Sequence, residues 1–324
     1  MVQPPETVYN QKASHFRLEF FIGPDTEVRG DLVVELAEWF LAHLLFPGCR
    51  PVSLDTKRRG GGNAPNMGEY SERRWKASVK KARAGEYAVL GIEVQTPDVP
   101  QQKIWFYAHV NPPGGDEFLG SGTIEVSCSL AYLRHLAVSP AKVDALLEFG
   151  RRTWNGVHGG PAYGFGNLAI ILARPRFGAL APRPPGAPMP WDIIMPPAEP
   201  AHAIPVAYVG NDVDGNLASL YCKGRGIKGA FWANYLSAAH VRLAGGPEEL
   251  RAKLSGIRAE PLEHGGMLVV ATDSPLPEDS ADNHRRFRRV HEALRPSFLS
   301  RDETPEGKRP MLGHFYRERA RETT

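Results

Sequence analysis

The sequence has little cysteine and no long hydrophobic run. Its three cysteines, Cys49, Cys128 and Cys222, are widely separated and never form a C-x-x-C pair. This disfavours a disulfide framework and a structural zinc site. No stretch approaches the roughly 18 apolar residues of a membrane span, and Met1-Val-Gln-Pro-Pro-Glu lacks the basic and apolar regions of a signal peptide. We therefore expect a soluble, cytoplasmic protein with no membrane partner.

An excess of charge of one sign is also missing. The 324 residues include 39 Lys and Arg against 36 Asp and Glu, which leaves a formal net charge of +3. A balance this close gives no general attraction to nucleic acid or to an anionic membrane, so only local clusters can indicate such partners.

Catalytic signatures are absent as well. The sequence contains no G-x-S-x-G and no H-E-x-x-H motif. His284 and His291 are seven residues apart, which is the wrong spacing for two ligands of one metal ion on a helix. The sequence therefore predicts no catalytic residue, no cofactor and no metal site.

What is present is a pattern of strands and helices that predicts an α+β fold. We expect a mixed, mainly antiparallel sheet with helices packed on one face, in two loosely similar halves. Ser139 followed by Pro140 is a typical helix start, and Asp31 is a plausible N-cap. The predicted strands cover residues 15–22, 87–94, 103–110, 123–130, 207–209 and 267–271, and the predicted helices cover 31–45, 139–154, 247–254 and 280–294.

Proline divides the chain. Ten prolines lie between Pro175 and Pro205, which excludes a regular helix or a central strand there. We therefore predict an N-terminal half over 1–174, an extended strap over 175–205, a C-terminal half over 206–300 and a charged tail over 301–324, all forming one compact unit.

Two basic segments each permit two interpretations. Residues 56–66 combine Lys57, Arg58 and Arg59 with three glycines, and we predict a mobile loop. It serves either as a basic arm for an acidic partner or a phosphate backbone, or as a solvated insertion. The helix around 284–289 carries four arginines in five positions, but acidic residues lie beside them, which favours a solvated face over nucleic-acid binding.

Two aromatic segments are the strongest candidates for a binding surface. Five glycines in residues 155–167 surround His158 and Tyr163, which fits either a binding surface or a tight helix-to-strand crossover. Residues 226–246 place Phe231, Trp232, Tyr235 and Leu236 within six positions. Such a cluster is either core or an anchor for a partner.

Three blocks in order carry a resemblance. They are His158-Gly-Gly-Pro-Ala-Tyr-Gly after a helix, Gly226-Ile-Lys-Gly-Ala-Phe-Trp-Ala-Asn-Tyr-Leu followed by Gly245-Gly246, and Gly266-Met-Leu-Val-Val-Ala-Thr-Asp-Ser-Pro before a helix ending in Leu294-Arg-Pro. Over roughly residues 15–300 the chain resembles the bacterial type VI immunity family. The basic loop at 57–62, the proline strap and the tail from Arg301 depart from that pattern.

The resemblance implies a protein that neutralises a cognate toxin by stoichiometric binding and has no active site of its own. Phe231 and Leu236 are expected in the core. Two alternatives stay open, a hydrolase-like enzyme using His158 and a nucleic-acid-binding protein using residues 284–289, and so does homo-oligomerisation. The predicted partner-binding residues are Trp154, His158, Tyr163, Arg225, Lys228, Trp232, Asn234 and Tyr235, with Arg58 and Arg59 as rim charges.

Overall fold

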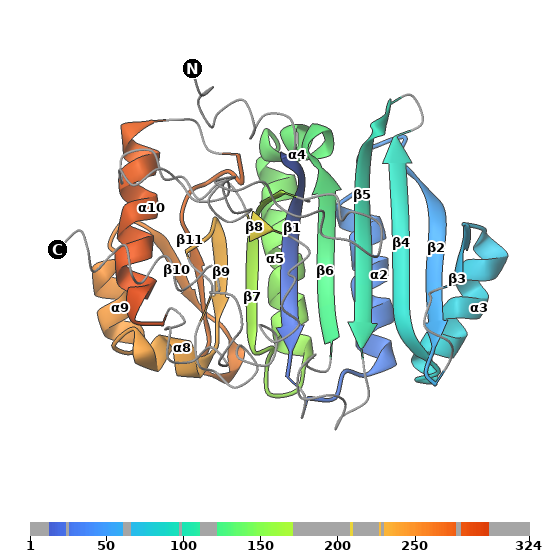
Figure 1. The fold of residues 1–324 in the computed structure, drawn as a ribbon, viewed down its shortest axis with the longest axis horizontal. Coiled ribbons are helices and arrows are strands. Elements are labelled where there is room, and N and C mark those ends of the chain that lie inside the picture. The colour runs from blue at the N-terminus through green and yellow to red at the C-terminus, as the bar shows by residue number, and fades with distance from the viewer. Residues whose placement is uncertain are drawn as a thin grey trace, which may run out of the picture.

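The described strands form one continuous sheet. The computed structural model describes residues 13–23, 26–60, 66–96, 99–110, 122–170, 208–209, 227, 230–276 and 280–297. Within them the strand order is β10-β11-β9-β7-β1-β6-β5-β4-β2-β3, with β8 paired to β7 (Figure 1). The pairing of β8 with β7 is parallel, and the pairings along the main path are antiparallel. The predicted α+β class with a mainly antiparallel sheet is confirmed.

The strands have the following bounds: β1 Ala13–Ile22, β2 Arg50–Arg58, β3 Asn66–Glu69, β4 Tyr87–Thr96, β5 Val99–Val110, β6 Gly122–Ser129, β7 Tyr163–Ile170, β8 Tyr208–Val209, β9 Ala233–Leu236, β10 Arg258–Pro261 and β11 Met267–Val270. The helices are α2 Gly30–His43, α3 Glu72–Arg83, α4 Leu130–Ala137, α5 Pro140–Gly156, α8 Ala238–Leu243, α9 Pro247–Lys253 and α10 Ala281–Leu294, with short 3₁₀ turns η2 Glu263–Gly265 and η3 Arg295–Ser297.

The predicted helix starts are largely correct. Ser139 is the N-cap of α5 and Pro140 is its first residue. In α10 the hydroxyl of Ser280 accepts a hydrogen bond from the Asn283 backbone N–H at 3.2 Å, which satisfies one of the free donors at a helix start. For α2, in contrast, the N-cap is Arg29, and Asp31 lies in the first helical turn. There it still complements the helix dipole.

The loop predicted over residues 56–66 is partly wrong. Strand β2 continues to Arg58, because Lys57 pairs with Val89 and Arg58 with Tyr87 of β4, and β3 begins at Asn66. Charged residues suit strands near the edge of a sheet, where one side reaches solvent. The glycines at 61–62 lie outside the described residues, as do the predicted strap at 175–205 and the predicted tail at 301–324.

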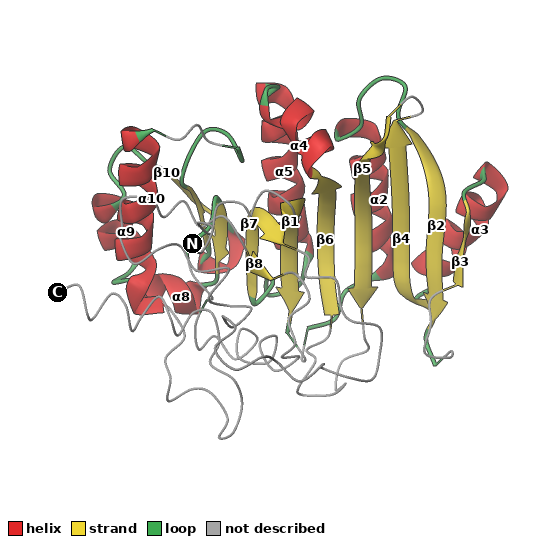
Figure 2. Ribbon diagram, turned by 45° about the horizontal axis from the view of Figure 1, so that its top comes forward, coloured by secondary structure: helices red, strands yellow, loops and turns green. Residues whose placement is uncertain are grey.

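Helices cover one face of the N-terminal strands. In β5 the even-numbered residues from Ile104 to Val110 are buried, and the odd-numbered residues from Lys103 to His109 are half-buried. The even face meets the helices, because the Phe106 ring lies 6.0 Å from Phe40 of α2 and 6.2 Å from Phe149 of α5. Figures 1 and 2 show α2 and α5 on this side of the sheet. The odd face is therefore not covered by these helices.

Candidate partner-binding surface

The two predicted halves join through strands β7 and β9. Tyr163 pairs with Leu236 and Phe165 with Asn234, so the sheet runs through the junction without a break. Four aromatic residues that the sequence placed at a contact surface are at most 1% exposed here: Trp154, Tyr163, Trp232 and Tyr235. In this structure they are core residues.

Trp154 and Tyr235 fasten helix α5 to the C-terminal strands. The Tyr235 hydroxyl donates to the Leu147 carbonyl at 3.1 Å, and the Trp154 indole N–H donates to the Glu263 carbonyl at 3.1 Å. Both rings pack directly against a glycine. A Cβ at Gly150 would lie 2.1 Å from Tyr235 Oη, and a Cβ at Gly266 would lie 2.7 Å from Trp154 Cζ2. Both aromatic residues thus position neighbouring elements.

Asn234 holds the turn that leads into β9. It is fully buried, and its amide both accepts from the Phe231 N–H at 3.0 Å and donates to the Phe231 carbonyl at 2.9 Å. The neighbouring Trp232 donates its indole N–H to the Thr272 carbonyl at 2.8 Å. Buried polar groups need such partners. A role of Asn234 and Trp232 in partner contact stays a prediction, and in this structure both side chains are buried.

The remaining predicted partner residues do not join this cluster. His158 lies exposed on the turn after α5, and Arg58 and Arg59 lie exposed at the end of β2, near the opposite end of the strand order. Arg225 and Lys228 lie outside the described residues. The predicted set therefore forms no single surface patch in the described part of the chain.

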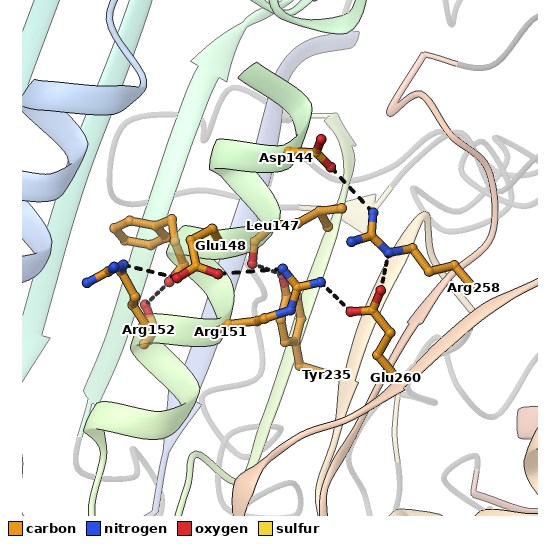
Figure 3. Close-up of polar contacts among 10 residues, drawn as sticks. Asp144, Leu147, Glu148, Arg151, Arg152, Tyr235, Arg258 and Glu260 are labelled. Carbon is orange, nitrogen blue, oxygen red and sulfur yellow. Dashed lines mark hydrogen bonds and ion pairs between the residues drawn. The ribbon is translucent and has the colours of Figure 1, made fainter. Parts of the chain in front are cut away.

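A chain of ion pairs ties α5 to the edge strand β10 (Figure 3). Arg151 contacts Glu148 at 3.6 Å and also pairs with Glu260, and Arg258 contacts Glu260 at 2.6 Å and Asp144 at 3.5 Å. Burial on its own raises the pKa of Glu260, but hydrogen bonds from the two arginines outweigh it and lower this pKa. The network orients the end of the sheet against the helix.

The arginines of α10 are largely engaged within the protein. Arg285 pairs with Asp282 at 3.1 Å, Arg286 lies 3.6 Å from both Asp282 and Asp273, and Arg289 donates to the Ser255 carbonyl at 2.6 Å. These contacts agree with the solvated-face interpretation. Among the described residues, no group of three His, Cys, Asp or Glu is arranged to hold a metal ion.

The side of the N-terminal strands that α2 and α5 do not cover is the surface that sequence reasoning missed. Paired residues of neighbouring strands share a face, so the register fixes which side chains lie together. We call this surface the open face, and it comprises the outward residues of β2, β4, β5, β6 and β1. Its first row is Asp55, Gly91, Tyr107, Glu125 and Glu19, and its second is Ser53, Glu93, Trp105, Ser127 and Arg17. Toward β1 this face is closed, because Glu19 and Ser127 are buried.

A hollow of about 220 Å³ lies on the open face. Its walls include Asp55, Trp105, Tyr107, Glu125 and Arg17. Gly91 has no side chain to fill the space, and a Cβ there would lie 3.0 Å from the Tyr107 ring and 3.3 Å from Asp55 Cβ. His158, proposed above for a hydrolase, is not among the residues that line this hollow.

Carboxylates dominate the charge around the hollow. Burial raises the pKa of Asp55, nearby Glu93 raises it further, and a hydrogen bond from Ser53 opposes both effects. Burial also raises the pKa of Tyr107, followed by the charges of Glu125 and Asp55. The hollow therefore combines partly desolvated negative charge with aromatic rings.

Comparison with known proteins agrees with the resemblance found in the sequence. A family model described as "TsiV: Type VI immunity for VRR-NUC" matches residues 197–320. This match confirms the resemblance to the type VI immunity family. It runs to residue 320, so the expectation that the tail from Arg301 departs from the family pattern was wrong for residues 301–320. The solved structure of Pseudomonas aeruginosa T6SS protein PA0821 has a similar fold, with a TM-score of 0.52 and 16% identity over 94% of this chain and 81% of that chain. No curated protein matches the chain.

The type VI immunity match covers the C-terminal part of the fold. Within residues 197–320 the structure describes β8, β9, α8, α9, β10, β11 and α10 with the turns η2 and η3. The matched segment therefore contains Trp232, Asn234 and Tyr235. The open face, from β1 to β6, lies outside it. None of the described helices has the length and apolar character that crossing a membrane requires.

Proposed function

We propose that this chain is an immunity protein that neutralises a cognate bacterial toxin by stoichiometric binding. The observation that carries the proposal is the match of residues 197–320 to a family described as type VI immunity for VRR-NUC. That description makes a nuclease of the VRR-NUC class the expected toxin. Inhibition by binding requires an interface of about 800 Å² on each partner and a few well-packed anchor residues.

Co-expression with the toxin encoded beside the gene tests the proposal. The full chain should restore growth of cells that produce the toxin, and the two proteins should co-purify as a complex. An unrelated nuclease toxin is the control, because protection against it would indicate a general effect on growth. Absence of both rescue and complex would overturn the proposal.

A titration separates binding from catalysis. In a nuclease assay with purified proteins, a stoichiometric inhibitor abolishes cleavage near one equivalent of this chain per active toxin. An enzyme that modifies the toxin would protect at far lower ratios and with time. His158→Ala should keep the end point near one equivalent, because a stoichiometric inhibitor needs no catalytic imidazole, whereas an enzyme that uses His158 would lose its protection.

A further inference from the structure

The open face carries more negative than positive charge near its hollow. Its two central rows contain the half-buried carboxylates of Asp55, Glu93 and Glu125 and the buried carboxylate of Glu19, against the cations Arg17 and, beside Glu93, Lys103. Arg17 lies 3.6 Å from Glu125 and 3.8 Å from Glu19, and Lys103 lies 2.7 Å from Glu93. Two of the four carboxylates therefore share one arginine, and a third has a lysine.

Among the described residues of the open face, Asp55 is the carboxylate that has no close cation. Its Oδ1 accepts a hydrogen bond from the Ser53 hydroxyl at 3.1 Å. Among the described residues no Lys or Arg nitrogen lies within 4.0 Å of its oxygens, and Arg74 acts on it only from farther away. A half-buried carboxylate in this setting has lost part of its hydration, so a cation brought by a partner would stabilise it.

The aromatic rings beside Asp55 suit the same type of ligand. Trp105 and Tyr107 both line the hollow and are half-buried, and Trp105 is fixed by a side-chain hydrogen bond to Glu93. A guanidinium or ammonium group is attracted to the face of such rings as well as to carboxylates. Trp, Tyr and Arg are also the side chains that most often dominate binding energy at interfaces.

A nuclease is a partner whose charge complements this surface. It must bind the phosphate backbone of its substrate, and proteins do so with Lys and Arg. Resting on the proposed function, we infer that the open face docks onto the cationic, phosphate-binding surface of the toxin, with a Lys or Arg side chain of the toxin in the hollow between Asp55 and Tyr107. Binding there blocks nucleic acid, because the same cations cannot also contact phosphate.

Helix α3 does not offer a comparable surface for such a partner. It carries six Lys or Arg and a single Glu within Glu72–Arg83, and like charges brought together across an interface oppose association. The open face is therefore preferred for a cationic toxin.

Affinity measurements with isosteric variants test the inference. The full chain and its Asp55→Asn, Glu125→Gln and Tyr107→Ala variants are titrated by calorimetry against a catalytically inactive form of the neighbouring toxin. We expect each hollow variant to bind at least about tenfold more weakly. The wild-type affinity should also fall with salt more steeply than that of Asp55→Asn.

Two controls match the change in charge on other surfaces. Glu35→Gln lies on the exposed side of α2, and Glu292→Gln lies on α10 within the segment that matches the immunity family. Both should bind like wild type. Asp55→Asn removes a carboxylate without a close cation, so its melting temperature should not fall, which separates lost binding from lost folding.

The outcomes distinguish the two proposals. A wild-type chain that binds the toxin, together with hollow variants that bind equally well, would overturn the docking inference and leave the immunity function intact. Weaker binding by Glu292→Gln together with unchanged binding by Asp55→Asn would also overturn the docking inference and leave the immunity function intact. A wild-type chain that neither binds the toxin nor protects cells would overturn the immunity proposal, and the docking inference with it.

Discussion

Replacing Gly150 with alanine should destabilise this protein, although helices ordinarily favour alanine over glycine by about 0.5–1 kcal/mol. Gly150 is buried in the middle of α5. A Cβ there would lie 2.1 Å from Tyr235 Oη and 2.3 Å from Tyr235 Cζ. The ring must therefore move, and the hydrogen bond from Tyr235 to the Leu147 carbonyl is lost with it.

The net effect of Gly150→Ala follows from three contributions. Overpacking of a buried position costs about 1–3 kcal/mol. Loss of the Tyr235 hydrogen bond destabilises by a further amount of about 0.5–1.5 kcal/mol. The helix preference of alanine offsets about 0.5–1 kcal/mol of this loss. We therefore expect the free energy of unfolding to fall by about 0.5–4 kcal/mol.

Urea unfolding followed by circular dichroism measures this change, and a double-mutant cycle assigns it. Tyr235→Leu removes the hydroxyl and the ring that the new Cβ would meet. In that background Gly150→Ala should be neutral or stabilising, which gives a coupling between the two positions. Stabilisation by Gly150→Ala in the wild type, or the same loss in both backgrounds, would refute the packing argument.

Three further predictions concern buried and half-buried polar groups. Asn234→Ala leaves the Phe231 N–H and carbonyl without their partner and should lower the free energy of unfolding by about 1–3 kcal/mol for each group; unchanged stability with lost toxin binding would instead favour a contact role for Asn234. Burial opposes but does not cancel the hydrogen bonds from Arg258 and Arg151 that lower the pKa of Glu260, so the stability that Glu260 contributes is present above about pH 4.5 and lost as the pH falls through its folded pKa. Melting temperatures from pH 3 to 7 should therefore show a weaker acid loss in Glu260→Gln than in wild type. Burial, with the charge of Arg295, lowers the pKa of His291 from 6.5 to about 4. The wild-type protein should therefore lose stability as the pH falls from 6.5 to about 4, and His291→Gln should not show this loss. An NMR titration of the imidazole measures the pKa directly.

Much of the secondary structure could be predicted because its signals are local. Ser280 precedes a helix whose predicted apolar stripe of Phe287, Val290, Ala293 and Leu294 is buried. The strands predicted at 87–94, 103–110 and 123–130 are β4, β5 and β6, adjacent in the sheet. The alternation of apolar and polar residues requires only one buried face, which each strand carries in its own sequence.

Elements with weak local signals were not predicted. Helix α3 has few apolar residues and is held by Trp75, Ser78 and Ala82 on its buried side. Strand β3 is four residues long and pairs with β2 at the edge of the sheet. Both depend on tertiary contacts rather than on a periodic apolar pattern, and such contacts override intrinsic preference.

The sequence indicates the open face through alternating strands and not through the aromatic segment at 226–246. Residues 231–236 of the aromatic segment are buried at every position, and Met267–Val270 is likewise buried throughout. A strand covered on both faces reads as a continuous apolar run, whereas a strand covered on one face alternates. At the junction both faces are covered in this way: Tyr235 meets α5 on one side, and Tyr163 meets His240 of α8 on the other. The alternating strands β4, β5 and β6 therefore carry polar and aromatic side chains on the side that α2 and α5 do not cover, and the continuous runs mark the core.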